Sequence, residues 1–119
     1  PPGQFELVES RRDPCGVLVS EVILQQTQAV RGEPAWAAFL ARFPTVGALA
    51  AASPAAVLRA WAGLGYNRRA LNLRRAAQAI VERHAGHVPR TVAELEALPG
   101  VGAYTARAVQ SNTSTAATL

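Results

Sequence analysis

Helix-starting and helix-breaking residues recur along this chain at short intervals, and their spacing constrains the fold more than any other feature. Asp or Ser followed by Pro is typical of a helix start, because the side chain caps free N–H groups and Pro fits the first turn. Gly and Pro after an apolar stretch are typical of a helix end. Predicted helices begin near Asp13-Pro14, Gly32-Glu33-Pro34, Thr45, Ser53-Pro54, Asn67, Thr91-Val92-Ala93-Glu94 and Ala103.

The lengths of these segments predict a bundle of mostly short helices. The first is expected to reach about Gln28, and the segment after Pro34 ends before Pro44. The longest is expected from about Asn67 to His84, and a short one from Thr91 to about Leu98. Ala supplies much of the hydrophobic content and aromatic residues make up only 6%, which favours packed helices over a sheet. The sequence predicts an all-α fold, and 119 residues exclude two large domains.

The ionisable residues restrict the possible chemistry. The net charge is +4, which is compatible with a polyanionic partner, and all twelve basic residues are Arg, which excludes a lysine Schiff base. Cys15 is the only cysteine, so no cysteine-held cluster or disulfide forms within these residues. His84 and His87 lack partners at metal-ligand spacing. With neither a signal-peptide layout nor a membrane-length apolar run, an intracellular protein is expected, cytoplasmic or nucleoid-associated.

The strongest local motif is Leu98-Pro99-Gly100-Val101-Gly102, which separates two predicted helices. Glycines let the backbone turn sharply and present N–H groups at a helix start, where a phosphate oxygen is attracted. Such a contact gives affinity without sequence choice. Plain turns between helices use the same residue types, so the local pattern leaves both interpretations open.

Three ordered motifs resemble the endonuclease III and MutY superfamily of DNA glycosylases. The glycine turn followed by Tyr104-Thr105-Ala106 resembles its helix-hairpin-helix, and two earlier blocks resemble the MutY-type adenine branch: Ser20-Glu21-Val22-Ile23-Leu24-Gln25-Gln26-Thr27-Gln28 and Trp61-Ala62-Gly63-Leu64-Gly65-Tyr66. The resemblance spans about residues 13–109. It implies the six-helix-barrel portion of such an enzyme over 13–110, with the helix-hairpin-helix at about 91–110, after an N-terminal extension at 1–12.

The resemblance implies two catalytic positions. Glu21 matches the acid that protonates the adenine leaving group, and its apolar surroundings are expected to raise its pKa. The alternative is a partly buried Glu that hydrogen-bonds to the backbone or to Arg. Tyr104 matches the active-site tyrosine found where endonuclease III has its Schiff-base lysine.

DNA-contacting positions follow from the same resemblance. Gln26 and Thr27 match residues that contact the base opposite the extruded adenine, whereas Leu64 and Tyr66 match the loop that wedges into the duplex. Structural roles for the Gln pair, and for Tyr66 as a helix cap, are the alternatives. Arg68 could bind phosphate beside the wedge, although a solvated basic face is the default interpretation. Gly100, Val101 and Gly102 form the expected phosphate-binding hairpin.

The chain departs from the family pattern near its end. The family places an essential aspartate after the helix that follows the hairpin, but the only aspartate is Asp13, which suits a helix cap. The four cysteines that hold a [4Fe–4S] cluster in most relatives and the domain that recognises 8-oxoguanine are also missing. From Ser111 to Leu119 the sequence is a poor helix continuation, so a frayed or altered tail is expected.

Three functional hypotheses result. The first is part of a monofunctional adenine DNA glycosylase of base-excision repair, which flips adenine opposite 8-oxoguanine or guanine and hydrolyses its N-glycosidic bond. Its partner would be double-stranded DNA with mispaired or oxidised bases. This chain alone, expected to be a monomer without a cofactor, would bind DNA weakly and excise nothing. The alternatives are a thymine or uracil mismatch glycosylase and a non-catalytic helix-hairpin-helix module.

Overall fold

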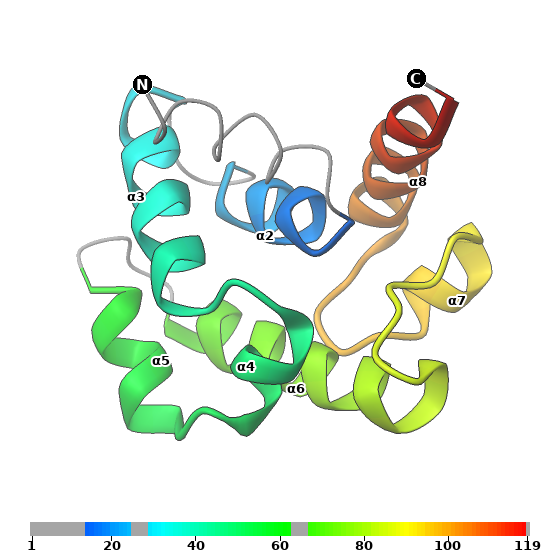
Figure 1. Cartoon of the computed structure of the whole chain (residues 1–119). Coiled ribbons are helices and arrows are strands. Elements are labelled where there is room, and N and C mark those ends of the chain that lie inside the picture. The colour runs from blue at the N-terminus through cyan, green and yellow to red at the C-terminus, as the bar shows by residue number, and fades with distance from the viewer. Residues whose placement is uncertain (1–13, 25–28, 63–66, 119) are drawn as a thin grey trace.

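The computed structural model describes residues 14–24, 29–62 and 67–118, and throughout these segments the ordered elements are helices. Side chains are described over the same segments except at residue 24, residues 29–34, residue 36 and residues 114–118. No strand occurs in the described part, so the predicted all-α class is confirmed (Figure 1). The helices are α2 (Pro14–Leu24), α3 (Ala29–Arg42), α4 (Val46–Ala51), α5 (Pro54–Ala60), α6 (Asn67–His84), α7 (Val92–Glu96) and α8 (Ala103–Thr118).

Side-chain caps fix the starts of the three shortest helices. The hydroxyl oxygens of Thr45, Ser53 and Thr91 accept hydrogen bonds from the backbone N–H groups three residues later, at 3.0, 3.1 and 3.2 Å. Each bond satisfies a donor that the first turn cannot pair internally. The predicted starts of α4, α5 and α7 are therefore confirmed, as are the predicted bounds of α6.

Two helix boundaries differ from the sequence-based prediction. Helix α3 begins at Ala29, before the expected restart at Pro34. One Pro near the amino end removes only one helical N–H, and burial of Phe39 and Leu40 stabilises the remainder.

Helix α8 likewise continues past Ser111 to Thr118, so the expected helix end near Ser111 is wrong. The hydroxyl of Thr113 donates to the backbone oxygens of Val109 and Gln110 at 2.7 and 3.2 Å, which satisfies this buried polar side chain inside the helix.

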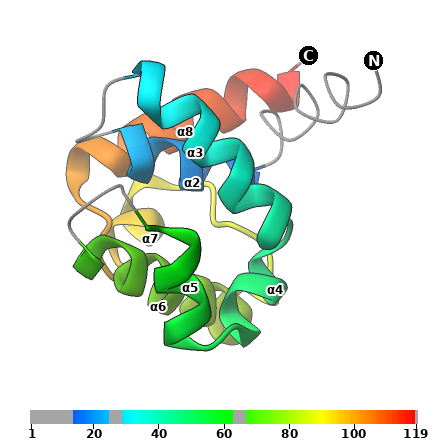
Figure 2. The same cartoon turned by 90° about the vertical axis from the view of Figure 1, so that its left-hand side faces the viewer.

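Helix α2 is the structural centre of the described chain. It packs against α3, α6 and α8, while α4 and α5 pack on α6 and α7 packs on α8 (Figures 1 and 2). Val19 and Ile23 of α2 are almost completely buried. Phe39 stacks obliquely with Phe43 at 5.1 Å and edge-on with Trp61 at 5.7 Å between ring centroids, which joins α3 to the end of α5. Among the described helices, none is long and apolar enough to cross a membrane.

Candidate DNA-repair site

The glycine hairpin lies between α7 and α8 with two apolar anchors beneath it. Leu98 and Val101 are buried, and the N–H of Val101 donates to the carbonyl oxygen of Leu98 at 3.1 Å. Gly100 has φ of +75°, a backbone conformation that favours glycine, and both Gly100 and Gly102 are exposed. The anchors fix the turn from below and leave its glycine backbone facing solvent.

The two glycines differ in what surrounds them. A Cβ at Gly100 would lie 2.7 Å from the Cβ of Asn72 on α6, so the backbone of the hairpin approaches this helix too closely for any side chain. A Cβ at Gly102 would meet nothing within 4 Å. Gly100 is therefore needed for packing and backbone conformation, whereas the protein itself leaves space at Gly102.

Helix α8 starts directly from this hairpin. The carbonyl oxygen of Gly102 accepts the N–H of Ala106 at 2.9 Å, which closes the first turn. The N–H groups of a first turn lack intrahelical acceptors and carry the positive end of the helix dipole. Since Gly102, Ala103 and Tyr104 are exposed, this end of α8 is accessible to an anion such as a backbone phosphate.

Glu21 lies on α2 and is partly buried. Burial raises the pKa of its carboxyl group, and a hydrogen bond from Asn112 partly offsets this increase. The side-chain N–H of Asn112 donates to Oε1 of Glu21 at 2.9 Å. The described partner of this carboxylate is thus an amide of α8, neither an arginine nor a backbone group.

One residue further along α2, the chain is tied to α6. Arg69 Nη1 donates to the carbonyl oxygen of Val22 at 2.9 Å, and burial lowers the pKa of the Arg69 guanidinium. A cavity of about 60 Å³ lies here, bordered by Val22, Arg69, Asn72 and the hairpin residues Pro99, Gly100 and Val101. This volume holds a few waters and is too small for a nucleobase. It shows, however, that Val22, the residue after Glu21 on α2, borders the same cavity as the hairpin.

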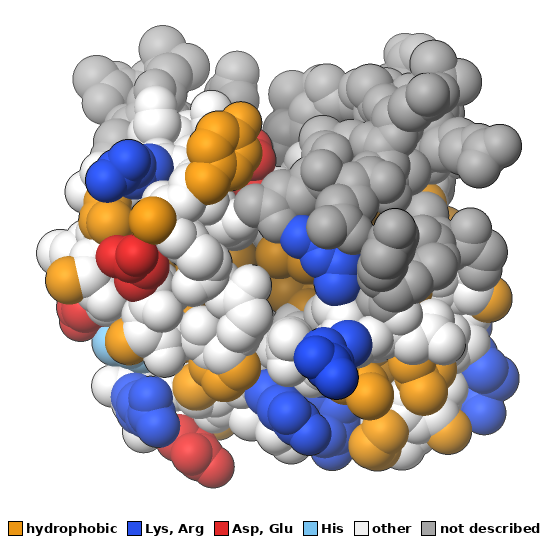
Figure 3. Space-filling model, turned by 180° about the vertical axis from the view of Figure 1, so that it is seen from behind, with side chains coloured by type: hydrophobic (Ala, Val, Ile, Leu, Met, Phe, Trp, Pro, Cys, Tyr) orange, Lys and Arg blue, Asp and Glu red, His pale blue; other side chains and the backbone are white. Residues whose placement is uncertain are grey.

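The surface seen from behind in Figure 3 is hollowed near its middle. Hydrophobic side chains form the bottom of the hollow, and basic side chains lie at its edge and across the lower half of this face. A surface with exposed arginines and an apolar recess is suited to a polyanion that also presents flat rings.

Comparison with known proteins identifies the family. Residues 19–117 match the HhH-GPD superfamily base excision DNA repair protein family. This chain belongs to that family. It is similar to the adenine DNA glycosylase of Mycolicibacterium smegmatis, with 56% identity over 93 residues, which are 78% of this chain and 32% of the relative. The chain thus spans about a third of that relative's length.

Solved structures of the same fold agree with this assignment. A thermostable thymine-DNA glycosylase superposes with a TM-score of 0.81 at 26% identity, over 90% of this chain and 51% of the other. An endonuclease III in a non-covalent complex with DNA superposes with a TM-score of 0.78 at 25% identity, over 83% and 47% of the two chains. The predicted membership in the endonuclease III superfamily is confirmed.

Several positions predicted to act in this HhH-GPD chain are not brought together by the described contacts. Tyr104 is 74% exposed on the first turn of α8, and Asn112, the partner of Glu21, lies eight residues later, about 12 Å along the helix axis. Arg68 is exposed at the start of α6, a position open to phosphate or to solvent alone. Gln26, Thr27, Leu64 and Tyr66 lie outside the described residues.

Two residues at the site were not predicted from the sequence. Asn112 falls in the segment expected to fray, and Asn72 looks like an ordinary polar position on a helix. Nothing local in the sequence signals that one faces Glu21 or that the other lies under Gly100, because both contacts join segments far apart in the chain.

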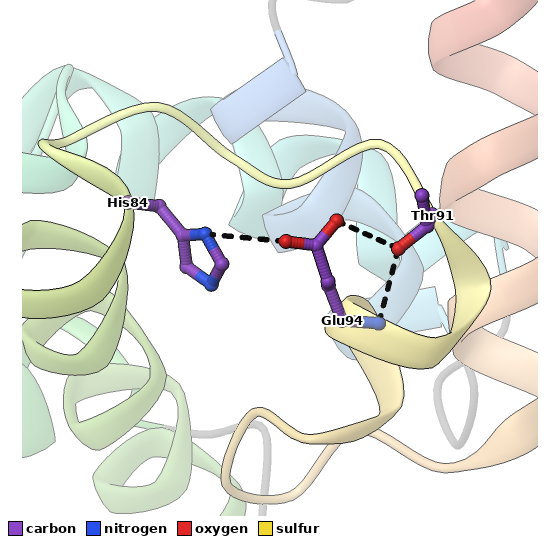
Figure 4. Close-up of polar contacts among 3 residues, drawn as sticks. All are labelled: His84, Thr91 and Glu94. Carbon is purple, nitrogen blue, oxygen red and sulfur yellow. Dashed lines mark hydrogen bonds and ion pairs between the residues drawn. The ribbon is translucent and has the colours of Figure 1, made fainter.

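The residues of this chain do not fit an iron–sulfur cluster. Cys15 is the single cysteine and is buried, whereas a cluster needs several thiolates. Within the described residues, no three His, Cys, Asp or Glu side chains are grouped to hold a metal ion. His84 instead lies 3.7 Å from Glu94, which joins the end of α6 to the start of α7 (Figure 4).

Proposed function

We propose that this chain is the DNA-binding, leaving-group-protonating portion of an adenine-specific DNA glycosylase in base-excision repair. The observation that carries the proposal is the junction of α2 with α8 and the hairpin: the partly buried carboxyl group of Glu21 bonds to Asn112 of α8, and the next residue, Val22, borders the same cavity as Gly100. The similarity to relatives named adenine DNA glycosylase supports the choice of adenine.

The hairpin and Glu21 would have different roles in this function. The exposed hairpin at Gly100 and Gly102, with the start of α8, would bind a phosphate of double-stranded DNA without reading its sequence. The raised pKa of Glu21 keeps more of its carboxyl group protonated at a given pH, which suits proton donation to a base leaving the sugar. The base must be flipped out of the duplex first, because the bond to be broken is enclosed by stacking.

Other predicted residues belong to the same proposal. Gln26 and Thr27 would contact the base opposite the flipped adenine, and Leu64 and Tyr66 would fill the space that it vacates. Arg68 would bind a neighbouring phosphate. Tyr104, exposed at the start of α8, would lie against the DNA and would not itself carry the proton.

The chain by itself is proposed to bind DNA weakly and to excise no base. Its single aspartate, Asp13, lies outside the described residues and immediately before α2. An oxocarbenium-like sugar needs a carboxylate beside it, and Glu21 cannot readily serve both as the acid and as that carboxylate. In the whole protein, an aspartate, an iron–sulfur cluster and a domain that recognises 8-oxoguanine would come from other parts.

The test uses the chain extended to its natural end, with duplexes containing adenine opposite 8-oxoguanine, adenine opposite guanine, or thymine opposite guanine. Excision of adenine is expected, and Glu21→Gln should abolish it while leaving duplex affinity within about twofold. Excision of thymine alone would instead support a mismatch thymine glycosylase, which the 26% identical thymine-DNA glycosylase keeps as a second candidate.

A non-catalytic helix-hairpin-helix module is the candidate of another class, favoured by the presence of one aspartate only. This candidate predicts salt-sensitive binding that is equal for matched and mismatched duplexes. The glycosylase predicts tighter binding to a duplex with an abasic or mismatched site at the same salt concentration. Gel filtration on the same samples tests the expected monomer, and imaging of the tagged whole protein tests nucleoid association.

A further inference from the structure

The carboxyl group of Glu21 has two oxygens with different surroundings. Oε1 accepts the hydrogen bond from the Asn112 side chain at 2.9 Å, across the interface between α2 and α8. No other hydrogen bond from a described side chain reaches this carboxyl group. The two oxygens therefore differ among the described contacts: Oε1 accepts the amide of Asn112, and no described side chain donates to Oε2.

Asn112 is itself held in place by the packing of α8. Val109 and Thr113, three residues before it and one after it, are buried, and the hydroxyl of Thr113 donates to the carbonyl oxygen of Val109. Neighbours of this kind fix the rotation of the helix about its axis. Asn112 is therefore presented to α2 by a stable helix face rather than by a mobile loop.

We propose that Asn112 is a positioning residue, which holds Oε1 of Glu21 so that Oε2 carries the proton given to the leaving base. This inference rests on the proposed function. An amide N–H donates best to the carbonyl-type oxygen of a neutral carboxyl group, so a proton on Glu21 is favoured on the other oxygen. Rotation of the carboxyl group is also restricted, which keeps that proton in one direction.

In the proposed excision step, Glu21 gives its proton to the base as the glycosidic bond breaks. The proton leaves Oε2 for a ring nitrogen of the base, and the bond between C1′ and the base breaks with its electron pair remaining on the base. Glu21 becomes a carboxylate, which the N–H of Asn112 stabilises. A water oxygen then bonds to C1′ and loses a proton, which completes hydrolysis and restores the acid.

The charged groups near α2 do not replace Asn112 in this role. The helices packed against α2 carry several arginines, among them Arg42 on α3, Arg69 on α6 and Arg107 on α8, and among the described residues no ion pair joins an arginine to Glu21. The Arg69 guanidinium donates to the backbone of Val22. The hydrogen bond from Asn112 is thus the described interaction whose removal should change the titration of Glu21.

The test follows the Glu21 carboxyl carbon by NMR as a function of pH in the 119-residue chain, with Glu21→Gln to assign the signal. Asn112→Leu removes the donor at similar volume, and Gln110→Ala on the same helix is the matched control. Asn112→Leu is expected to raise the pKa of Glu21 by about half a unit to one unit, a threefold to tenfold weaker acid. Equal titration midpoints in the two variants would overturn the proposal.

A second measurement needs no substitution at Asn112. In the wild-type chain the side-chain amide signals of Asn112 should move with the titration midpoint of Glu21, and this movement should vanish in Glu21→Gln. Amide signals that are independent of pH would contradict the contact. A loss of packing alone would not produce a shared midpoint, so this readout separates positioning from general stability.

Activity gives an independent readout in the protein extended to its natural end. Asn112→Leu should lower kcat for excision about tenfold and displace its pH profile, while KM stays within about twofold. An unchanged kcat and pH profile would overturn the positioning role. If the extended wild-type protein excises no base, the proposed function fails, yet the NMR titrations still decide whether Asn112 controls Glu21.

Discussion

Gly100 and Gly102 occupy the same exposed hairpin but respond differently to an added methyl group. Gly100→Ala forces a side chain into φ of +75° and against Asn72, so it should lower the free energy of unfolding by about 1–3 kcal/mol. Gly102→Ala meets open space and should change stability by less than about 0.5 kcal/mol. Urea unfolding of the two variants measures the difference.

Gly102→Ala, which should hardly change stability, should nevertheless weaken DNA binding when the affinity is measured per folded molecule. The methyl group of Gly102→Ala would stand where a phosphate approaches the start of α8, and the loss of one such contact should weaken duplex binding about twofold to tenfold. Fluorescence anisotropy with a labelled duplex at fixed salt checks this. A Gly102→Ala chain that binds as tightly as wild type would show that DNA does not approach at this position.

The raised pKa of Glu21 also has a consequence for stability. A carboxyl group whose pKa is higher in the folded than in the unfolded chain binds more protons when folded, so folding weakens as pH rises through this range. Glu21→Gln removes the buried charge and should raise the Tm at neutral pH. The advantage should disappear below pH about 4, where both states are protonated. Thermal unfolding at pH 3.5 and pH 7 tests this, and a Glu21→Gln chain less stable at pH 7 would contradict it.

At the scale of elements, α7 illustrates how much a single cap contributes. This helix has five residues, and the Thr91 hydroxyl both accepts the N–H of Glu94 at 3.2 Å and donates to Oε1 of Glu94 at 2.7 Å (Figure 4). Thr91→Ala should cost about 1 kcal/mol in urea unfolding. His84→Ala, which removes a contact of 3.7 Å between partly buried His84 and exposed Glu94, should cost less than about 0.5 kcal/mol. Equal losses would show that the contact with His84 stabilises α7 as much as the cap does.

The elements predicted well from sequence are those whose ends are decided by neighbours in the chain. Three helix starts are capped by a hydroxyl that bonds to the backbone N–H three residues later: those at Thr45, Ser53 and Thr91. These helices could therefore be located without any tertiary information. The helix starts and ends that depend on packing could not be located from the sequence. Helix α3 extends upstream of Pro34, and α8 runs through its Ser- and Thr-rich end because Thr113 is buried against the core and bonds its own backbone.

The same distinction applies to the candidate site. Glu21, Gly100 and Gly102 could be predicted as candidates because their motifs are contiguous in sequence. Asn112 was missed because its contact with Glu21 bridges 91 positions and forms only when α2 and α8 are packed together. A sequence motif can therefore point to the proposed acid, whereas its hydrogen-bond partner is found only from the tertiary structure.

At the scale of the whole described chain, α2 packs against helices of two sets. On one side it meets α3, whose aromatic residues pack on the end of α5, and on the other it meets α8, which carries α7 (Figure 1). The Arg69 bond to Val22 adds a link to α6. A site built at such a centre is held by the entire core, so a loss of packing in α2 should weaken both sets of helices together.

Ile23 tests whether the molecule unfolds as one unit. Its side chain is 1% exposed in α2, and Ile23→Val should lower the free energy of unfolding by about 1 kcal/mol, whereas Val81→Ala at a 42% exposed position should change it by less than about 0.5 kcal/mol. Because α2 contacts both sets of helices, tryptophan fluorescence and far-UV circular dichroism should give one shared urea midpoint, displaced equally by Ile23→Val. Two separate midpoints, only one of which moves, would mean that α2 stabilises one set of helices alone, and that Glu21 could be displaced from Asn112 without unfolding the rest.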